Sequence, residues 1–344
     1  MKRATIAILM CAALLPASCK KKQADSKAPS TASADMKAMT ADPARPAMEA
    51  ARKAEPRRAA TRPAAAPPAK IVIKLVDAGK GKKQKLRYQF VAGTSHVMVM
   101  DMLMKNHFKF QGREMPVNMP KMRYRLNVKV DKAAEAGWSH FVLGGISIGF
   151  PDPPQGARGK AIVAAMEKAK SVMAKMTFSY DIDSRGFFKH VHIALPPTAP
   201  APMRAMMKQI GGSMKQSLMF STVPLPEQAV GQGAKWTAVV PMNLPMMKFT
   251  AHMEYVVKKL KGDTVTLAMK MKGVAPKQQM KLPGGQGSMD LDKLDTSASG
   301  TLTLSLVHPV PTGELVTETA MVGKAAGSAM EMKMHMNLSL KKGK

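Results

Sequence analysis

One pentapeptide of this sequence has the pattern of a hydrolase nucleophile. Gly145–Gly149, with the sequence GISIG, fits G-x-S-x-G, in which a serine on a tight strand-to-helix turn exposes its hydroxyl. The next residues, Phe150–Pro154, are rich in proline and cannot begin the required helix directly. Because the pentapeptide also alternates as a strand does, we interpret it as a strand with Ser147 facing away from its isoleucines. No paired carboxylates and no nucleophile–base arrangement stand out elsewhere, so the sequence predicts no catalytic residue and no enzyme activity.

Histidine and methionine are the side chains that could ligate a metal. His190 and His192 share one face of a predicted strand, as two zinc ligands would, but no third ligand is evident and metal binding there stays open. Methionines at every second position form two strings, and thioethers suit Cu(I). The strings are Met98, Met100, Met102 and Met104, and Met330, Met332, Met334 and Met336. A strand with one buried face explains the same spacing. We therefore expect an apolar, methionine-lined face, either a closed core or an open groove, with no metal and no cofactor.

Strand-like alternation dominates the chain from Ile71 onward. The segments with a period of two are Ile71–Leu75, Leu86–Phe90, Met122–Val130, Phe141–Ile148, Met176–Asp183, Phe187–Leu195, Trp236–Val240, Met246–Lys259, Thr264–Lys272, Ser299–Val307, Glu314–Val322 and Ser328–Leu340. Ala157–Lys175 instead has the period of an amphipathic helix, and Met203–Leu218 follows a proline-rich break as a short helix. The sequence thus predicts a mainly β (α+β) fold, in which long antiparallel β-meanders carry one or two helices packed on the sheet.

The two halves of the body, residues 71–200 and 220–340, echo each other. Met122–Val130 with His140–Ile148 resembles Lys248–Val257 with Thr264–Lys272, each pair joined by a charged turn. We hypothesise two repeats that form a duplicated, half-open barrel and are joined by the proline-rich helical segment. The alternative is that any two antiparallel hairpins look alike.

The N-terminus has the features of a secretory signal. Lys2 and Arg3 precede an apolar run that ends in small residues directly before Cys19. This stretch resembles a bacterial lipoprotein signal, which implies acylation of the cysteine thiol, for example with palmitate. We expect residues 1–18 to be the signal peptide and Cys19 to be the lipid attachment site. An ordinary cleaved signal and an uncleaved anchor are the alternatives.

Residues 19–70 have the composition of a tether. Alanine, proline, serine and lysine dominate there, and no apolar periodicity survives. A segment of this kind cannot bury enough apolar surface to fold, so we predict a lipidated, disordered and basic linker that holds the body off a membrane.

The charge and the cysteine usage narrow the class of protein. The formal net charge is +30, and cleavage before Cys19 would remove Lys2 and Arg3 and leave +28. Such a field attracts anionic lipids and polymers. Aromatic residues are only 5% of the chain, so stacking platforms are scarce and we expect no nucleic-acid partner. The cysteines, Cys11 and Cys19, both lie in the signal region, so the mature body would contain no internal disulfide.

A family resemblance agrees with this interpretation. Phe220–Trp236, which contains FSTVPLPEQAV and the spacing Val230, Gly233, Trp236, resembles a family of functionally uncharacterised bacterial envelope lipoproteins, as does the Asp–Gly hairpin at Asp181–Gly186. The resemblance implies a location in the bacterial cell envelope and a β-meander, without an activity.

The expected function follows from the anchor and the methionine faces. The sequence predicts a non-catalytic lipoprotein of the bacterial cell envelope (periplasm and outer membrane), bound by its acyl anchor to membrane lipid, with a role in binding an apolar or amphipathic ligand. The alternatives are an interaction module for anionic envelope polymers and, less favoured, a Cu(I)-binding protein. The sequence does not identify the ligand, the leaflet or the oligomeric state.

Overall fold

The computed structural model describes most of the chain beyond residue 70, and these residues belong to one compact unit, Ala69–Lys344. The described ranges are 71–134, 137–152, 173–197, 222–243, 247–281, 288–325 and 327–344, together with residues 156, 159, 160, 163, 164, 167 and 170. The signal peptide, Cys19, the tether and the second expected helix, Met203–Leu218, lie outside the described residues. Their predictions therefore stay predictions.

Sixteen β-strands make up the described part of the chain. They are β1 (Val72–Asp77), β2 (Lys80–Gln84), β3 (Ser95–Phe110), β4 (Arg113–Asn118), β5 (Met122–Ala134), β6 (Trp138–Gly149), β7 (Thr177–Asp183), β8 (Phe188–Ala194), β9 (Val230–Gln232), β10 (Lys235–Asn243), β11 (Lys248–Lys261), β12 (Thr264–Val274), β13 (Gln278–Lys281), β14 (Ser288–Ser305), β15 (Thr312–Ala325) and β16 (Ser328–Lys342). Strands account for 70% of the structure and helix for 5%, which confirms the mainly β class.

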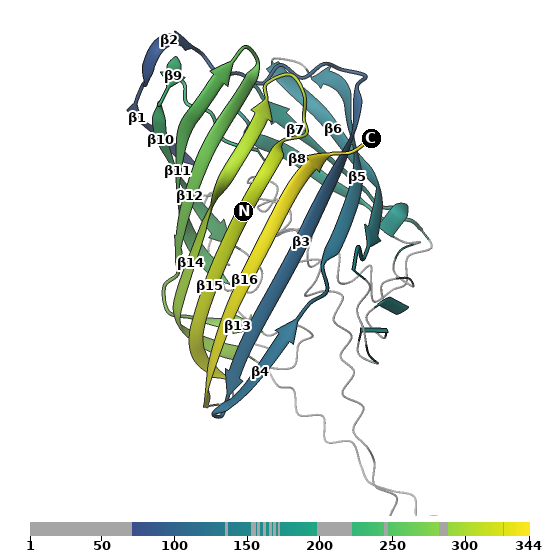
Figure 1. Ribbon diagram of the computed structural model, residues 1–344, viewed down its shortest axis with the longest axis vertical. Coiled ribbons are helices and arrows are strands. Elements are labelled where there is room, and N and C mark those ends of the chain that lie inside the picture. Colours follow the sequence, from purple (N-terminus) through teal and green to yellow (C-terminus); the bar gives the residue numbers. More distant parts are fainter. Residues whose placement is uncertain are drawn as a thin grey trace, which may run out of the picture. The chain divides into compact units, whose positions relative to one another are not determined.

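Fourteen of the strands form one antiparallel sheet. Its order is β1-β10-β11-β12-β14-β15-β16-β3-β5-β6-β7-β8, with β13 paired to β14 and β4 paired to β3 (Figure 1). The path has two ends, β1 and β8, so the sheet is open rather than closed on itself. β2 and β9 form a separate two-stranded sheet. The pairing of β16 with β3 joins the last strand of the chain to the first long one.

Only one helical region is described. Val163, Ala164, Glu167, Lys170 and Met173 are helical, within the range predicted for the amphipathic helix. Met173 is buried in the core, and Lys170 lies 3.3 Å from Glu167 on the outer side. No helix of the described residues is both long enough and apolar enough to cross a membrane.

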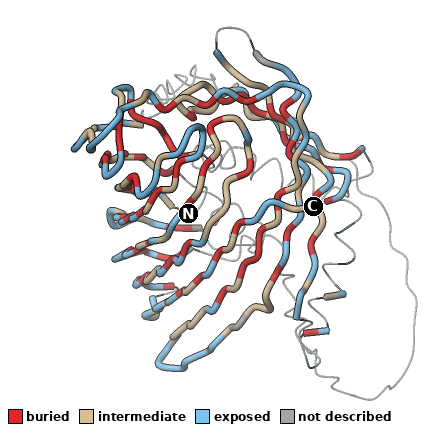
Figure 2. The backbone as a smooth tube through the Cα atoms, turned by 45° about the horizontal axis from the view of Figure 1, so that its top comes forward, coloured by how far each residue is buried: buried red, intermediate tan, exposed pale blue. Residues whose placement is uncertain are grey.

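The alternation of side chains gives the sheet one apolar face. Along β12, Val265, Leu267, Met269 and Met271 are buried, and the residues between them are half-buried or exposed. Figure 2 shows the same alternation of buried and exposed positions along the other long strands. Because successive side chains point to opposite faces of a strand, this pattern places the apolar sets of the long strands on a shared inner face.

Two expectations about strands need correction. Leu86–Phe90 is not a strand, although its side chains alternate in burial as predicted. Its backbone bonds to separate loops, with the amides of Tyr88 and Gln89 donating to the carbonyls of Ser184 and Leu306, so no ladder forms. β14 begins at Ser288, well before the predicted start at Ser299, because β13 and β15 both pair with residues that precede Ser299.

The strand order accommodates the proposed duplication. β5, β6, β7 and β8 are consecutive neighbours in the sheet, and β11, β12, β14 and β15 repeat that sequence of neighbours. The hydroxyls of Tyr124 and Tyr255 each donate to the sulfur of the methionine two residues earlier, Met122 and Met253. Burial raises the pKa of the Tyr255 hydroxyl, which keeps it protonated as a donor. The duplication itself stays a prediction.

Candidate functional site

Both methionine strings lie on the inner face of the sheet. Met98, Met100, Met102 and Met104 of β3 are all buried in the main apolar core. Across the β3–β16 ladder Met104 is paired with Met336, which is completely buried. The predicted methionine-lined face is therefore present, and the central pair of strands contributes it.

Burial on this face decreases toward one end of the strands. Along β16 Met336 is 0% exposed and Met334 is 9% exposed, whereas Met332 and Met330 are only half-buried. Their partners on β3, Phe108 and Phe110, are half-buried as well. Along β3 and β16 the described residues therefore bury the inner apolar face almost fully at Met334 and Met336 and only in part at this end. We call Phe108, Phe110, Met330 and Met332 the half-covered end.

A second apolar cluster lies beside the half-covered end. It is separate from the main core, and its buried members come from β13, β14 and β15. They are Met280, Met289, Leu291, Leu294, Met321 and Ala325. Phe110, Met330 and Met332 pack against it as partly buried neighbours. The inner face therefore carries two distinct apolar regions.

Threonines lie on the inner face between these two regions. On β14, Thr296 stands between Leu294 of the second cluster and Ala298 of the main core. Its hydroxyl lies 2.8 Å from the hydroxyl of Thr319 on β15. Thr317, two residues earlier on β15, is 3% exposed, and its hydroxyl has no hydrogen-bond partner among the described residues. No signal in the sequence marked these threonines, because their positions depend on cross-strand register.

The opposite end of the sheet is closed by two loop segments. Residues 85–91 and 222–228 run across it, and their hydrogen bonds reach both outer parts of the sheet. The indole of Trp236 on β10 donates to the carbonyl of Pro224 at 3.0 Å, and the amide of Leu225 donates to the carbonyl of Arg185 at 2.9 Å. The hydroxyl of Tyr88 donates to the carbonyl of Val223. Leu225 and Trp236 are fully buried, so this end is a packed cap.

Turn chemistry at the β7–β8 hairpin holds the cap in place. The carboxylate of Asp183 accepts hydrogen bonds from the amides of Arg185 and Phe187, which fixes the turn. Gly186 has a φ of +88°, and a side chain there would meet the carbonyl of Val223 at 2.8 Å. The hairpin predicted at Asp181–Gly186 is therefore present, and it anchors the segment that carries most of the family resemblance.

The hydrolase-like motif lies within a strand, as expected. Ser147 is in the interior of β6, opposite Arg125 of β5, and its neighbours Ile146 and Ile148 are buried on the inner face. Gly145 has a φ of +59° at a bulge in the same ladder, where its close neighbour is Asn127. The strand-to-helix turn that a nucleophilic serine requires is not found at this serine.

The two candidate zinc ligands lie at different kinds of position in the β7–β8 ladder. His192 is opposite Ser179 of β7, and His190, with a φ of +50°, lies at a bulge between that pair and the next. The Nδ1 atom of His190 is 2.7 Å from one oxygen of Asp181, and Nδ1 of His140 is 2.7 Å from the other. Across the described part of the chain, no group of three or more histidine, cysteine or acidic side chains is arranged to hold a metal ion.

The carboxylate between the two histidines is held ionised. Burial raises the pKa of Asp181, but the hydrogen bonds from His140 and His190 outweigh it, and the pKa lies below its ordinary value. Lys189 lies over the ring of Trp138 at 3.9 Å beside this cluster. The sequence did not indicate the cluster, because its three members come from three strands.

The outer face contains a second buried carboxylate. Asp101 of β3 is 5% exposed, and Arg123 of β5, directly opposite, donates two hydrogen bonds to it at 2.6 and 2.9 Å. The hydrogen bond from Arg123 holds the pKa of Asp101 below its ordinary value. This ion pair links β3 and β5 on the face of the sheet opposite the methionines.

Comparisons with known proteins agree with an uncharacterised domain. Residues 199–308 match the model of a family of unknown function, DUF6263. This match spans the cap segment and the strands from β9 to β14. The curated proteins contain no match. The solved structure of Ail, the attachment invasion locus protein of Yersinia pestis, is 8% identical and the alignment covers 72% of this chain and 100% of that one. Its TM-score of 0.13 is too low to carry an argument.

Proposed function

We propose that this protein is a lipid-anchored lipoprotein of the bacterial envelope whose β body binds an apolar or amphipathic ligand on its inner face. It has no catalytic role in this proposal. The lipid anchor at Cys19 and the outer-membrane location rest on the sequence pattern of residues 1–19. The ligand role rests on the half-covered end.

The observation that carries the ligand role is the gradient of burial along β16. Burial of apolar surface stabilises a protein by about 25 cal/mol for each Å², so a folded chain normally covers its large apolar side chains. Among the described residues, Met330, Met332, Phe108 and Phe110 continue the fully buried row but are only half-buried. A long apolar ligand lying along β3 and β16 would cover them. Methionine suits this role because its flexible side chain adapts to ligands of different shape.

Matched variants on the two faces of β16 test the ligand role. In the inner variant, Met330→Gln and Met332→Gln keep side-chain size and add polarity. In the outer variant, Glu331→Gln and Lys333→Gln change the opposite face of the same stretch and leave the net charge unchanged. We expect the inner variant to bind the dye N-phenyl-1-naphthylamine about tenfold more weakly, because two apolar contacts are lost. The outer variant should bind as the wild type does.

Native mass spectrometry of the full chain, gently extracted from membranes, provides the second measurement. Retained lipid on the wild-type chain, reduced on the inner variant, would support the proposal. A wild-type chain that carries no lipid and binds no dye would refute the ligand role. So would an inner variant with an unchanged circular dichroism spectrum and unchanged dye affinity. Release of Cys19-linked acyl chains tests the anchor separately.

A further inference from the structure

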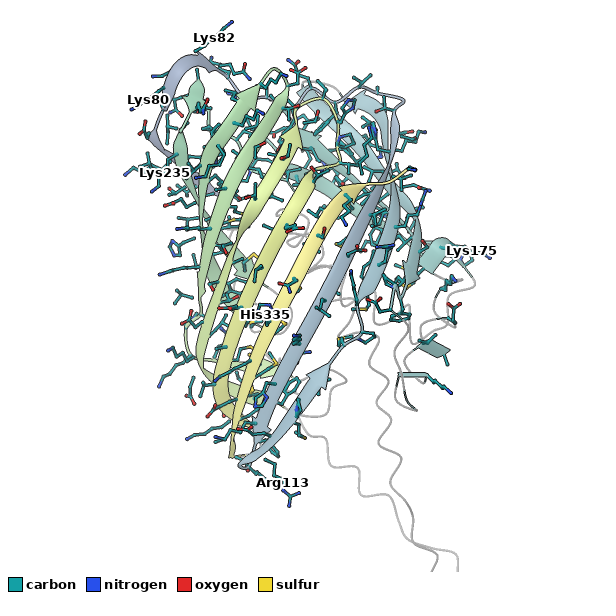
Figure 3. All side chains as sticks on the ribbon, in the orientation of Figure 1. Lys80, Lys82, Arg113, Lys175, Lys235 and His335 are labelled. Atoms are coloured by element: carbon teal, nitrogen blue, oxygen red, sulfur yellow. The ribbon has the colours of Figure 1, made fainter. Side chains whose placement is uncertain are left out.

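Six exposed lysines gather at the capped end of the sheet. β2 contributes three of them and the end of β11 contributes the other three. They are Lys80, Lys82, Lys83, Lys258, Lys259 and Lys261, and we call them the lysine corner. None of the six forms an ion pair with another described residue, whereas the nearby Lys235 is paired with Glu254 at 2.9 Å. Figure 3 shows Lys80 and Lys82 at the end of the strands opposite to Arg113.

Hydrogen bonds hold together the two segments of the chain that carry these lysines. Lys80 is paired with Gln232 in the β2–β9 ladder. The next residue, Gly233, donates its amide to the carbonyl of Val257 at 2.9 Å, and Lys258 follows directly. At the other end of β2, the side-chain amide of Gln84 donates to the carbonyl of Gly262 at 3.1 Å. The fold thus brings together two lysine groups that lie about 180 residues apart in the sequence.

Local backbone geometry also favours this arrangement. Gly231 of β9 approaches β2 so closely that a side chain there would collide with the carbonyl oxygen of Lys80. A bulge in the β11–β12 ladder falls between Val257 and Lys259. In a regular strand one of Lys258 and Lys259 would turn inward, but at the bulge both are exposed.

The charge of the corner is poorly balanced by acids. Asp77 and Asp263 are the acidic residues nearest to these lysines in the sequence, and Asp77 accepts a hydrogen bond from the amide of Gly79. The outer face of β14 and β15 is different, since its lysines are mixed with acidic side chains. These are Asp290, Asp292, Asp295, Glu314 and Glu318. The corner is therefore a part of the body from which a positive field extends.

We propose that the lysine corner docks the body onto an anionic phospholipid surface, with the capped end toward the bilayer and the half-covered end away from it. All six cations are lysines, which act as point charges for a diffuse array of headgroups, whereas the bidentate recognition of a single phosphate favours arginine. The corner also lies on turns and strand ends at the tip of the sheet, where a flat surface can reach it.

The chain that precedes β1 supports a membrane as the partner. About 50 residues separate Cys19 from Ile71, and the disordered linker that the sequence predicts for them would have an end-to-end distance of roughly 40 Å. An anchored body would thus stay close to the bilayer, which favours weak contacts by a high effective concentration. This step rests on the anchor in the proposed function and is independent of the ligand.

Single engineered cysteines test the orientation. A free thiol is added by Thr264→Cys, beside the corner, or by Ser299→Cys, on the exposed outer face of β14. Both labelled chains are reconstituted at full length into vesicles that contain nitroxide-headgroup lipids. With phosphatidylglycerol present, we expect the nitroxide to quench a fluorophore at position 264 and not one at position 299. With phosphatidylcholine alone, or at high salt, quenching should disappear.

Two quadruple variants distinguish an effect of the lysine corner from an effect of the net charge of the whole protein. The first changes Lys80, Lys82, Lys258 and Lys259 to Gln, and the matched control changes Lys270, Lys272, Lys293 and Lys324 to Gln. Each lysine near an anionic surface contributes about fivefold, so the corner variant should lose more than a hundredfold in partitioning onto phosphatidylglycerol vesicles. The control should change little. Equal losses in both variants, or quenching that does not depend on lipid charge, would overturn the proposal.

The design distinguishes a failure of the anchor from a failure of the corner. An acylated chain has no free thiol, because Cys11 is removed with the signal peptide and Cys19 is blocked, so the wild type should take up no fluorophore. Labelling of the wild type at Cys19 would refute acylation. Vesicle partitioning of the two quadruple variants would still decide the role of the corner.

Discussion

The ion pair between Asp101 and Arg123 gives the sharpest prediction about stability. Asp101 is buried on the outer face, and both of its oxygens accept hydrogen bonds from a guanidinium that is 48% exposed. Hydrogen bonds to charged groups contribute about 1.5–3 kcal/mol, and the exposure of Arg123 reduces this through solvent screening. We therefore expect Asp101→Asn to lower the free energy of unfolding by about 1–2 kcal/mol at pH 7.

Replacing the arginine of this ion pair should lower the free energy of unfolding by a larger amount. Arg123→Gln leaves a buried carboxylate whose remaining ion-pair partner among the described residues is Lys341, at 3.9 Å. When one partner of such a pair is removed, the other stays charged and loses its compensation, so we expect a larger loss of stability than for Asp101→Asn. Asp290→Asn, at an exposed position of β14, serves as the control and should stay within about 0.5 kcal/mol of the wild type.

The stabilisation that Asp101 provides depends on pH with a defined sign. The pKa of Asp101 is lower in the folded protein than in the unfolded chain, where it is about 3.9. The stabilisation is therefore fully present above pH 4 and is lost as the pH falls through the folded pKa. Urea unfolding followed by circular dichroism at several pH values measures this. If Asp101→Asn and the wild type lose stability in parallel between neutral and strongly acidic pH, the reasoning is wrong.

Four further substitutions, with Gly149→Ala as a control, test the packing. Thr317→Val should raise the free energy of unfolding by about 1 kcal/mol, because the buried hydroxyl has no hydrogen-bond partner among the described residues. Thr296→Val should lower it by about 1 kcal/mol, because the hydrogen bond between the two threonine hydroxyls is lost. Thermal unfolding of the two variants distinguishes these opposite signs. Trp236→Phe should cost about 2–3 kcal/mol, since it removes buried volume and the hydrogen bond that secures the cap, and an unchanged stability would contradict the cap. Gly231→Ala should increase amide exchange in β2 and β9, and Gly149→Ala, which has open space around it, should not.

Much of the fold could be predicted because period-two alternation is a local property. The buried positions of β12, and the placement of Ser147 away from the inner face, follow from which residues are apolar. Leu86–Phe90 shows the limit of this reasoning. Its alternation of burial is real, yet its backbone partners belong to two different loops, and no local pattern distinguishes that arrangement from a strand.

The candidate sites depend on contacts that the sequence does not encode locally. Asp181 lies between His140 and His190 only because β6, β7 and β8 are neighbours in this register. The sequence did not predict the start of β14, because a bulge between Leu291 and Lys293 breaks the alternation of its apolar residues and charged residues separate them. The stretch is nevertheless paired with strands on both sides. Tertiary pairing overrides weak β-propensity in such segments.

By itself, the sequence determined the alternating strands, the single apolar face with its methionine strings, and the strand setting of Ser147, because each of these depends on side-chain period and type. Only the tertiary structure decided how far each residue on that face is covered, which loops close one end of the sheet, and which lysines meet at that end. Those properties depend on register and on hydrogen bonds between segments far apart in the sequence, such as the one from Gln84 to Gly262, which are 178 residues apart.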